Sequence, residues 1–246
     1  MSLDFSLVIP TYNEAQGLRA LVERLCGVLQ PGGFRFELVV VDDNSPDGTG
    51  QVAEQLAREL PLKVVHRTGK LGLASAVIDG WQRSEGAVLG VIDADLSHDP
   101  DILPVMLSAV LRGGADVAVG SRYVPGGGMR DWPLYRQVIS RVACFMGYAL
   151  CPVRDVTSGY LCFRREVIQG VRLDPIGFKI GLEVLVRGRY RTFVEVPYIF
   201  RDRTAGQSKL SLKVIQAYLI QLGRLLAFSL RDRQIRIRLL PHNLAR

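Results

Sequence analysis

Two aspartates, Asp93 and Asp95, come directly after an apolar run at residues 88–92, which predicts a buried strand. Residues i and i+2 of an extended chain point to the same side, so the two carboxylates are expected to face together at the strand end. Carboxylates held this close repel each other unless a cation lies near them. A hard divalent ion, Mg²⁺ or Mn²⁺, suits such oxygen ligands and keeps positions for water and phosphate. The alternative is an Asp-rich turn that merely ends a strand.

A second pair of carboxylates, Asp42 and Asp43, ends another apolar run at residues 36–41. These side chains could accept hydrogen bonds from the base or ribose of a nucleotide. A divalent ion on the first pair would neutralise the charge that develops on a diphosphate leaving group. The two carboxylate pairs together therefore indicate a site for a nucleotide-sugar donor.

Basic residues could bind a second, anionic substrate or the leaving diphosphate. Arg122 is the strongest candidate, because it lies at the end of a strand predicted at residues 116–122, beside the proposed site, whereas a single arginine is usually a surface cation. The net charge of +7 favours anionic partners, such as a nucleotide, a phosphorylated substrate or an anionic membrane. Nucleic acid is not expected as a partner, because no recognition motif accompanies the charge. The other candidate cations are Arg136, Arg203 and Lys209.

The elements that must position these residues form a regular series in the first half of the chain. Apolar runs alternate with helical hydrophobic patterns at short loop lengths, which predicts an α/β fold with a mostly parallel central sheet and helices on both faces. Ligands of such sheets lie at the carboxyl ends of the strands. Asn13 is expected to cap the first helix, with Gln16 completing a capping box. Strands are expected at residues 5–10, 36–41, 62–66, 88–92, 116–122 and 192–200.

The sequence lacks the glycine-rich loops of two common classes of nucleotide-binding enzyme. Residues 10–14 replace the Gly-x-Gly-x-x-Gly loop of dinucleotide-binding enzymes, and no phosphate-cradling Walker loop is found. The four cysteines form no Cys-x-x-Cys pair and no cluster with histidine, which predicts buried, reduced thiols of a cytosolic protein. No signal peptide is expected at the N-terminus.

The C-terminal part of the chain has a different character. Residues 213–230 predict an apolar helix with a stripe at helical spacing, and five arginines occur from residue 231 onward. Its uncharged stretch is shorter than the roughly 20 residues that a membrane crossing needs. An amphipathic helix with a basic tail is typical of an interfacial membrane anchor, and the alternative is a helix docked on the core. We therefore expect a catalytic domain at residues 1–210 and an amphipathic, basic tail at residues 211–246.

Six segments occur in the order of a known family's motifs, and they span roughly residues 5–212. They are residues 8–14, 41–49, 93–98, 120–123, 155–160 and 203–210. With these segments the chain resembles the family 2 glycosyltransferases, which have the GT-A fold of nucleotide-diphospho-sugar transferases. Within that family it is most similar to the dolichol-phosphate and polyprenol-phosphate mannose synthases.

The resemblance implies a role for each matching residue. Asp93 and Asp95 would hold the metal, Mg²⁺ or Mn²⁺, and Ser97 stands where some relatives carry a glutamine ligand. Catalysis would depend on Asp93, Asp95 and Arg122. The acceptor phosphate would be bound by Arg122, Arg136 and Ser140. The nucleotide-sugar donor would be bound by Pro10, Tyr12, Glu14, Asp42, Asp93, Asp95, Arg203, Ser208 and Lys209.

The implied activity is transfer of one sugar with inversion at the anomeric carbon. The donor best matched by the resemblance is GDP-mannose, and the acceptor is polyprenyl or dolichyl phosphate at the cytosolic face of a membrane. The enzyme would be cytoplasmic and peripherally attached to that surface, with a small membrane-anchoring protein as a candidate partner. Three alternatives stay open: UDP-glucose or another nucleotide sugar as donor, a non-lipid acceptor, and a catalytically silent membrane-tethering subunit.

Overall fold

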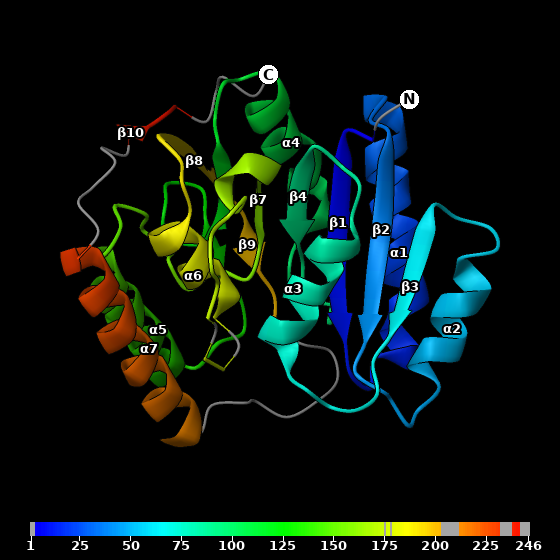
Figure 1. Ribbon diagram of the computed structural model, residues 1–246, viewed down its shortest axis with the longest axis horizontal. Coiled ribbons are helices and arrows are strands. Elements are labelled where there is room, and N and C mark those ends of the chain that lie inside the picture. The colour runs from blue at the N-terminus through cyan, green and yellow to red at the C-terminus, as the bar shows by residue number, and fades with distance from the viewer. Residues whose placement is uncertain (1–2, 175, 178, 203–211, 232–237, 242–246) are drawn as a thin grey trace.

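The computed structural model describes residues 3–174, 176–177, 179–202, 212–231 and 238–241. Strands and helices alternate through its first half, as the hydrophobic pattern predicts (Figure 1). The strands are β1 (Phe5–Thr11), β2 (Phe36–Asp42), β3 (Leu62–His66), β4 (Val88–Val91), β5 (Val117–Ser121), β6 (Gly128–Met129), β7 (Leu161–Arg164), β8 (Thr192–Pro197), β9 (Ile199–Phe200) and β10 (Arg238–Leu239). The α-helices are α1 (Ala15–Leu29), α2 (Thr49–Leu56), α3 (Leu73–Arg83), α4 (Leu103–Leu111), α5 (Leu134–Tyr148), α6 (Ile180–Arg187) and α7 (Leu212–Arg231).

The central sheet has the strand order β10-β8-β5-β7-β4-β1-β2-β3. Strand β7 runs antiparallel to its neighbours β4 and β5, and the other pairings in this sheet are parallel. Strands β6 and β9 form a separate parallel pair. The predicted α/β architecture with a mostly parallel sheet is confirmed.

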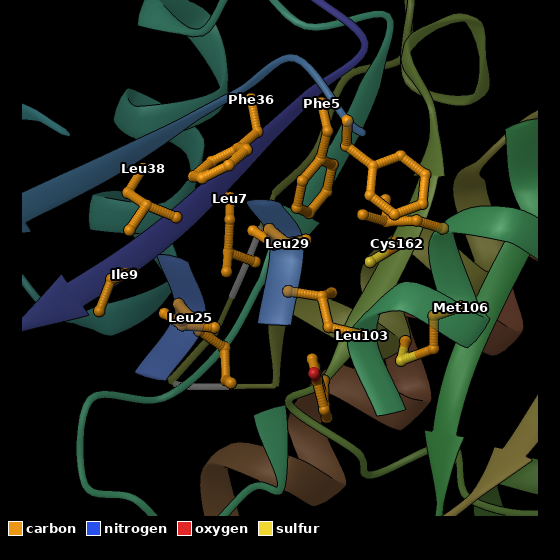
Figure 2. Close-up of a cluster of buried hydrophobic side chains, with 14 of the residues drawn as sticks. Phe5, Leu7, Ile9, Leu25, Leu29, Phe36, Leu38, Leu103, Met106 and Cys162 are labelled. Atoms are coloured by element: carbon orange, nitrogen blue, oxygen red, sulfur yellow. The ribbon is translucent and has the colours of Figure 1, made fainter. Parts of the chain in front are cut away.

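Hydrophobic side chains fill both faces of the sheet. Leu7 and Ile9 of β1 point to one face and pack with α1, α2 and α4. Figure 2 shows this cluster, with Leu25 and Leu29 of α1 drawn near Leu7. Val8, between them, points to the other face and packs with residues of α3 and α6. Complete burial of each such side chain contributes about 1.5–3 kcal/mol. Helices therefore cover both faces, as predicted.

The predicted capping box at the start of α1 is wrong. Asn13 has a left-handed backbone with φ of 59°, and the helix begins after Glu14 without a side-chain cap of its own. The loop that follows β2 supplies the acceptors for the first backbone N–H groups instead. These acceptors are the Ser45 hydroxyl at 3.0 Å, the Thr49 hydroxyl at 2.9 Å and the Asp47 carboxylate at 3.1 Å. The loops after β1 and β2 therefore stabilise each other.

The predicted single strand at residues 192–200 is two strands that belong to different sheets. Strand β8 pairs with β5 up to Pro197, and the Tyr198 N–H then donates to the Ser121 carbonyl at 3.1 Å. Beyond this point β9 pairs with β6. Alternation of apolar residues continues through the break, so the pattern alone does not reveal it.

The C-terminal helix α7 lies beside α5 and packs on α6 (Figure 1). The Tyr218 hydroxyl donates to the Ala143 carbonyl of α5 at 2.6 Å, and Leu222 and Leu225 are buried. Leu219 and Leu230 are exposed, so the helix is docked along one side and open along another. Within the part of the chain that the structure describes, no helix combines the length and apolarity that a membrane crossing needs.

Candidate active site

The turn after β4 holds Asp93 and Asp95, and its shape differs from the extended segment predicted. Strand β4 ends at Val91, so both aspartates lie in the turn rather than on one face of a strand. Leu96 has a left-handed backbone with φ of 60°, which is uncommon for a residue other than glycine. Such backbone is often found at functional sites, where the surrounding structure holds it in place.

Hydrogen bonds inside this turn hold Asp95, and other contacts surround Asp93. Asp95 Oδ1 accepts from the Ser97 backbone N at 3.1 Å and from Ser97 Oγ at 2.5 Å. Asp93 Oδ2 lies 4.0 Å from His98 Nδ1. On the other side, a Cβ at Gly159 would come within 3.3 Å of Asp93 Oδ2. Ser97 thus orients Asp95, and the absence of a side chain at Gly159 makes room for Asp93.

The chemistry of this turn fits a hard divalent cation. Asp93 and Asp95 are both partly exposed and offer carboxylate oxygens, which Mg²⁺ and Mn²⁺ prefer. Within the described residues, no group of three or more His, Cys, Asp or Glu side chains could hold a metal. The two aspartates would therefore supply the protein ligands, and water and phosphate oxygens would fill the remaining positions.

His98 is the last residue of the matching segment at residues 93–98, and the sequence analysis assigned it no role. Its ring is buried, stacks on Tyr198 at 5.6 Å between centroids and meets the edges of Tyr160 and Phe200. Burial lowers the pKa of His98, and the nearby Asp93 only partly opposes this. The imidazole is therefore expected to be neutral at pH 7, as a packing group that supports the turn.

The predicted donor residues gather at the neighbouring strand ends. Pro10 is buried at the end of β1, and the Tyr12 ring lies 3.8 Å from Lys70 Nζ. Asp42, at the end of β2, is buried and accepts hydrogen bonds from Thr11 and Ser45. Its carboxylate therefore supports the loop, and its predicted contact with the nucleotide stays a prediction.

The start of α1 joins this predicted donor side to the Asp93 turn. A Cβ at Gly17, in the first turns of α1, would lie 3.9 Å from the Ala94 carbonyl. Glu14, the remaining predicted donor residue of this group, immediately precedes the same helix and is partly buried. The start of α1 and the turn that holds Asp93 and Asp95 therefore lie against each other.

Asp43 has a structural partner that the sequence did not reveal. Its carboxylate pairs with the buried Arg67 and accepts from the Gly72 backbone N at 2.8 Å. Arg67 also reaches Asp79 of α3 at 3.0 Å. This ion-pair network ties the ends of β2 and β3 to the start of α3.

The predicted acceptor side is built around Arg122, which follows β5. Its Nε and Nη2 donate to the two carboxylate oxygens of Asp155, each at 2.7 Å, and Nη2 also donates to Thr157 at 2.9 Å. Both partners are buried. Burial disfavours the charge of Arg122, but Asp155 outweighs burial and raises the pKa of Arg122 above its usual value. The pair is therefore fully charged and held as one unit.

Arg136 and Ser140 of α5 are brought to the same place as Arg122. The Trp132 ring lies 5.7 Å from the Arg122 guanidinium carbon and 4.1 Å from that of Arg136. Tyr123 donates a hydrogen bond to Ser140 at 2.7 Å. Arg136 also pairs with Asp202 at 3.2 Å. The three residues predicted to bind the acceptor phosphate thus form one cluster.

The sequence motifs did not identify Lys179, the residue before α6. Its ammonium donates to the Thr157 carbonyl at 2.9 Å, beside the Arg122–Asp155 pair. The antiparallel direction of β7 explains why the polar turn before it reaches the site. The start of β7 lies at the edge of the sheet where the neighbouring parallel strands end. The polar turn at residues 155–159, directly before a strand, was the signal in the sequence that could have identified this region.

Three predicted donor residues, Arg203, Ser208 and Lys209, lie outside the described residues.

Comparisons with known proteins identify the family of this chain. Residues 6–171 match the family model described as glycosyl transferase family 2. The chain is 45% identical over 225 residues to a dolichol-phosphate mannosyltransferase of Pyrococcus furiosus, covering 90% of this chain and 63% of that protein. It is 37% identical over 239 residues to the dolichol-phosphate mannosyltransferase of Saccharomyces cerevisiae, covering 93% of this chain and 89% of that protein.

A solved structure shares the fold. A mannosyltransferase from Pyrobaculum calidifontis, in complex with GDP-Man and Mn²⁺, matches with a TM-score of 0.57 at 20% identity, over 95% of this chain and 66% of that chain. At this identity the likeness concerns the fold. Since the family model covers most of the chain and both relatives exceed 30% identity, the chain belongs to glycosyl transferase family 2 and has its GT-A type of α/β fold.

Proposed function

We propose that this glycosyltransferase transfers one mannose from GDP-mannose to a polyprenyl or dolichyl phosphate, with inversion at the anomeric carbon. The observation that carries the proposal is the placement of two charge clusters at one edge of the sheet. Asp93 and Asp95 form the acidic cluster, and the cationic cluster contains Arg122 and Arg136. The first suits a metal with a diphosphate, and the second suits a phosphate acceptor.

The reaction needs positioning more than proton transfer. A phosphate monoester is largely a dianion at neutral pH, so its oxygen is already nucleophilic and no general base is required. That oxygen bonds to the anomeric carbon while the carbon–oxygen bond to the β-phosphate breaks, and the electron pair leaves with GDP. A divalent metal, when bound by Asp93 and Asp95, neutralises charge on the leaving diphosphate. Arg136 and Ser140 would orient the acceptor phosphate beside Arg122.

An exposed apolar surface on α5 and α7 supports a lipid acceptor. We define the α5–α7 surface by its exposed apolar residues, and in Figure 1 the two helices lie side by side. Arg136 and Ser140 belong to the same α5 helix, so a membrane against this surface would deliver a lipid phosphate near them. The surface consists of Leu134, Tyr135, Val138, Val142, Phe145, Met146, Leu219, Ile220, Leu226 and Leu230.

This surface can be tested with vesicles. Phe145, with 80% of its surface exposed, should contribute strongly to binding at the cytosolic face of a membrane. We expect Phe145→Ser to weaken binding to anionic phospholipid vesicles by about tenfold, whereas Leu71→Ser, at an exposed leucine of a loop outside this surface, should not. Equal binding of both variants would favour attachment through a small membrane-anchoring protein instead.

The function itself is tested by a transfer assay. Purified protein is incubated with Mg²⁺ or Mn²⁺, a short polyprenyl phosphate and labelled GDP-mannose or UDP-glucose in parallel. Label should enter the lipid phase from GDP-mannose and stop doing so with a chelator. Transfer from UDP-glucose would change the donor, and donor binding without a lipid product would require another acceptor. A protein without metal-dependent donor binding would be a silent tethering subunit.

A further inference from the structure

Lys179 lies between the two charge clusters, although no motif contains it. Its ammonium donates to the Thr157 carbonyl at 2.9 Å. Thr157 also accepts from Arg122, and the same polar turn places Gly159 against Asp93. A single turn of backbone therefore separates the Lys179 ammonium from the carboxylate of the proposed metal site.

Contacts of the Lys179 backbone and of the nearby Gly181 fix the position of Lys179. Its own carbonyl accepts from Gln221 Nε2 of α7 at 3.1 Å. Two residues later, Gly181 packs so closely on the Ser158 carbonyl that a Cβ would lie 2.6 Å from it. The start of α6 therefore packs on the polar turn at residues 155–159, and this packing restricts the backbone that carries the Lys179 ammonium.

The charges around Lys179 make it a suitable phosphate ligand. Arg122 pairs with Asp155 and Arg136 with Asp202, and Lys179 adds a third cation beside the Arg122–Asp155 pair. An ammonium group donates more strongly to a phosphate than to a neutral oxygen such as a carbonyl. A dianionic acceptor brings two negative charges toward a diphosphate, and a further cation lowers the repulsion between them.

Burial and neighbouring charge act on Lys179 in a way that agrees with this role. Burial lowers the pKa of Lys179 to about 8, and the positive charge of Arg122 acts in the same direction. Asp155 and Asp93 oppose the shift, so the ammonium senses the charges of both clusters. Burial of a charge is costly, and the negative charge of a bound phosphate would offset part of that cost.

We propose that Lys179 is a catalytic residue that donates to the acceptor phosphate and holds it between Arg122 and the donor sugar. The inference rests on the proposed function. One phosphate oxygen forms the bond to the anomeric carbon, and the carbon–oxygen bond to the β-phosphate breaks with its electrons leaving on the diphosphate. Lys179 keeps its proton throughout, and its charge offsets that of the attacking dianion.

The matched control is Lys63, whose ammonium also donates to a backbone carbonyl, that of Arg83 at 2.8 Å, on the far strand β3. Lys179→Met, Lys179→Arg and Lys63→Met would be compared with the wild type by steady-state transfer kinetics. Calorimetry with a short isoprenyl phosphate in the absence of donor gives an independent binding readout. Thermal unfolding reports any structural effect.

We expect Lys179→Met to raise the KM for the lipid phosphate by at least tenfold and to weaken isoprenyl phosphate binding similarly, with the KM for GDP-mannose unchanged. Lys179→Arg should recover most of the loss, and Lys63→Met should match the wild type. Normal kinetics in Lys179→Met, equal losses for donor and acceptor, or no recovery in Lys179→Arg would overturn the inference. Failure of the wild type to transfer would instead remove the proposed function.

Discussion

The clusters proposed to bind the donor and the acceptor lie at one edge of the sheet, but they hold their charges in different ways. Asp93 and Asp95 are partly exposed in a turn fixed by short-range hydrogen bonds. Arg122 and Asp155 are buried and join segments far apart in the chain. Charges that must bind and release an ion suit an accessible turn, whereas a buried pair also helps to hold the fold. Function and stability should therefore separate in the first cluster and be linked in the second.

The largest effect should follow loss of a carboxylate in the turn. Asp95→Ala is expected to lower transfer by about 10³-fold, because the charge on the leaving diphosphate would lose its main source of neutralisation. Unfolding temperature should change little, since Asp95 is partly exposed. Asp101→Ala, at an exposed carboxylate paired with Arg24, is the control and should keep its activity. Retained transfer in Asp95→Ala would remove this residue from the metal role.

The buried pair should respond in the opposite way. Asp155→Ala leaves the Arg122 guanidinium buried without its carboxylate, which is expected to cost about 3–5 kcal/mol of unfolding free energy. Asp174→Ala, which removes an exposed partner of Arg224, should cost about 1 kcal/mol or less. Urea unfolding would measure both. Similar small losses in the two variants would mean that the buried pair does not stabilise the fold.

A smaller effect is expected at Ser97, which orients Asp95 through its hydroxyl. Ser97→Ala should weaken Mn²⁺ binding in the presence of GDP by about tenfold, because a hydrogen-bond partner of a metal ligand positions that ligand without contacting the ion. Ser108→Ala in α4, away from the turn, serves as the comparison. Unchanged Mn²⁺ affinity would show that the backbone of the turn alone positions Asp95.

Lowering the pH should reveal the contribution of the Arg122–Asp155 pair to the free energy of unfolding. Burial alone would raise the pKa of Asp155, but the charge and hydrogen bonds of Arg122 outweigh it and hold that pKa below the usual 3.8. The pair therefore stabilises the fold fully above pH 3.8, and this stabilisation is lost as pH falls through the folded pKa. Urea midpoints at decreasing pH should fall more steeply for the wild type than for Asp155→Asn. Parallel curves would contradict the assignment.

Local patterns in the sequence predicted the donor side well, because its residues follow strands in a regular series. The alternation of strands and helices and the placement of Asp93 and Asp95 at a strand end needed no long-range information. The extended geometry of that pair was wrong, since β4 ends earlier and Leu96 turns the chain. The capping of α1 was also wrong, because its acceptors come from another loop.

The acceptor side could not be predicted to the same depth. Arg122 was recognised as a cation at a strand end, but its pairing with Asp155 depends on the antiparallel direction of β7. The position of Lys179 depends on the same strand and on the packing of α6 against the turn at residues 155–159. For the C-terminal helix, the sequence left a docked and an interfacial interpretation open, and α7 has both a buried and an exposed side. Its division from the catalytic domain at residues 210 and 211 stays a prediction.

The direction of β7 also has a consequence for how the chain folds. Strands β1, β2 and β3 are neighbours in chain order and can assemble from consecutive crossover units, each of which closes a short loop. Strand β7 must instead insert between β4 and β5, both already synthesised, and this closure orders a longer stretch of chain. Until that insertion is complete, a nascent chain contains the acidic turn but leaves Arg122 without Asp155. The pairing of β7 with β4 and β5 is thus also the event that brings Asp155 to Arg122.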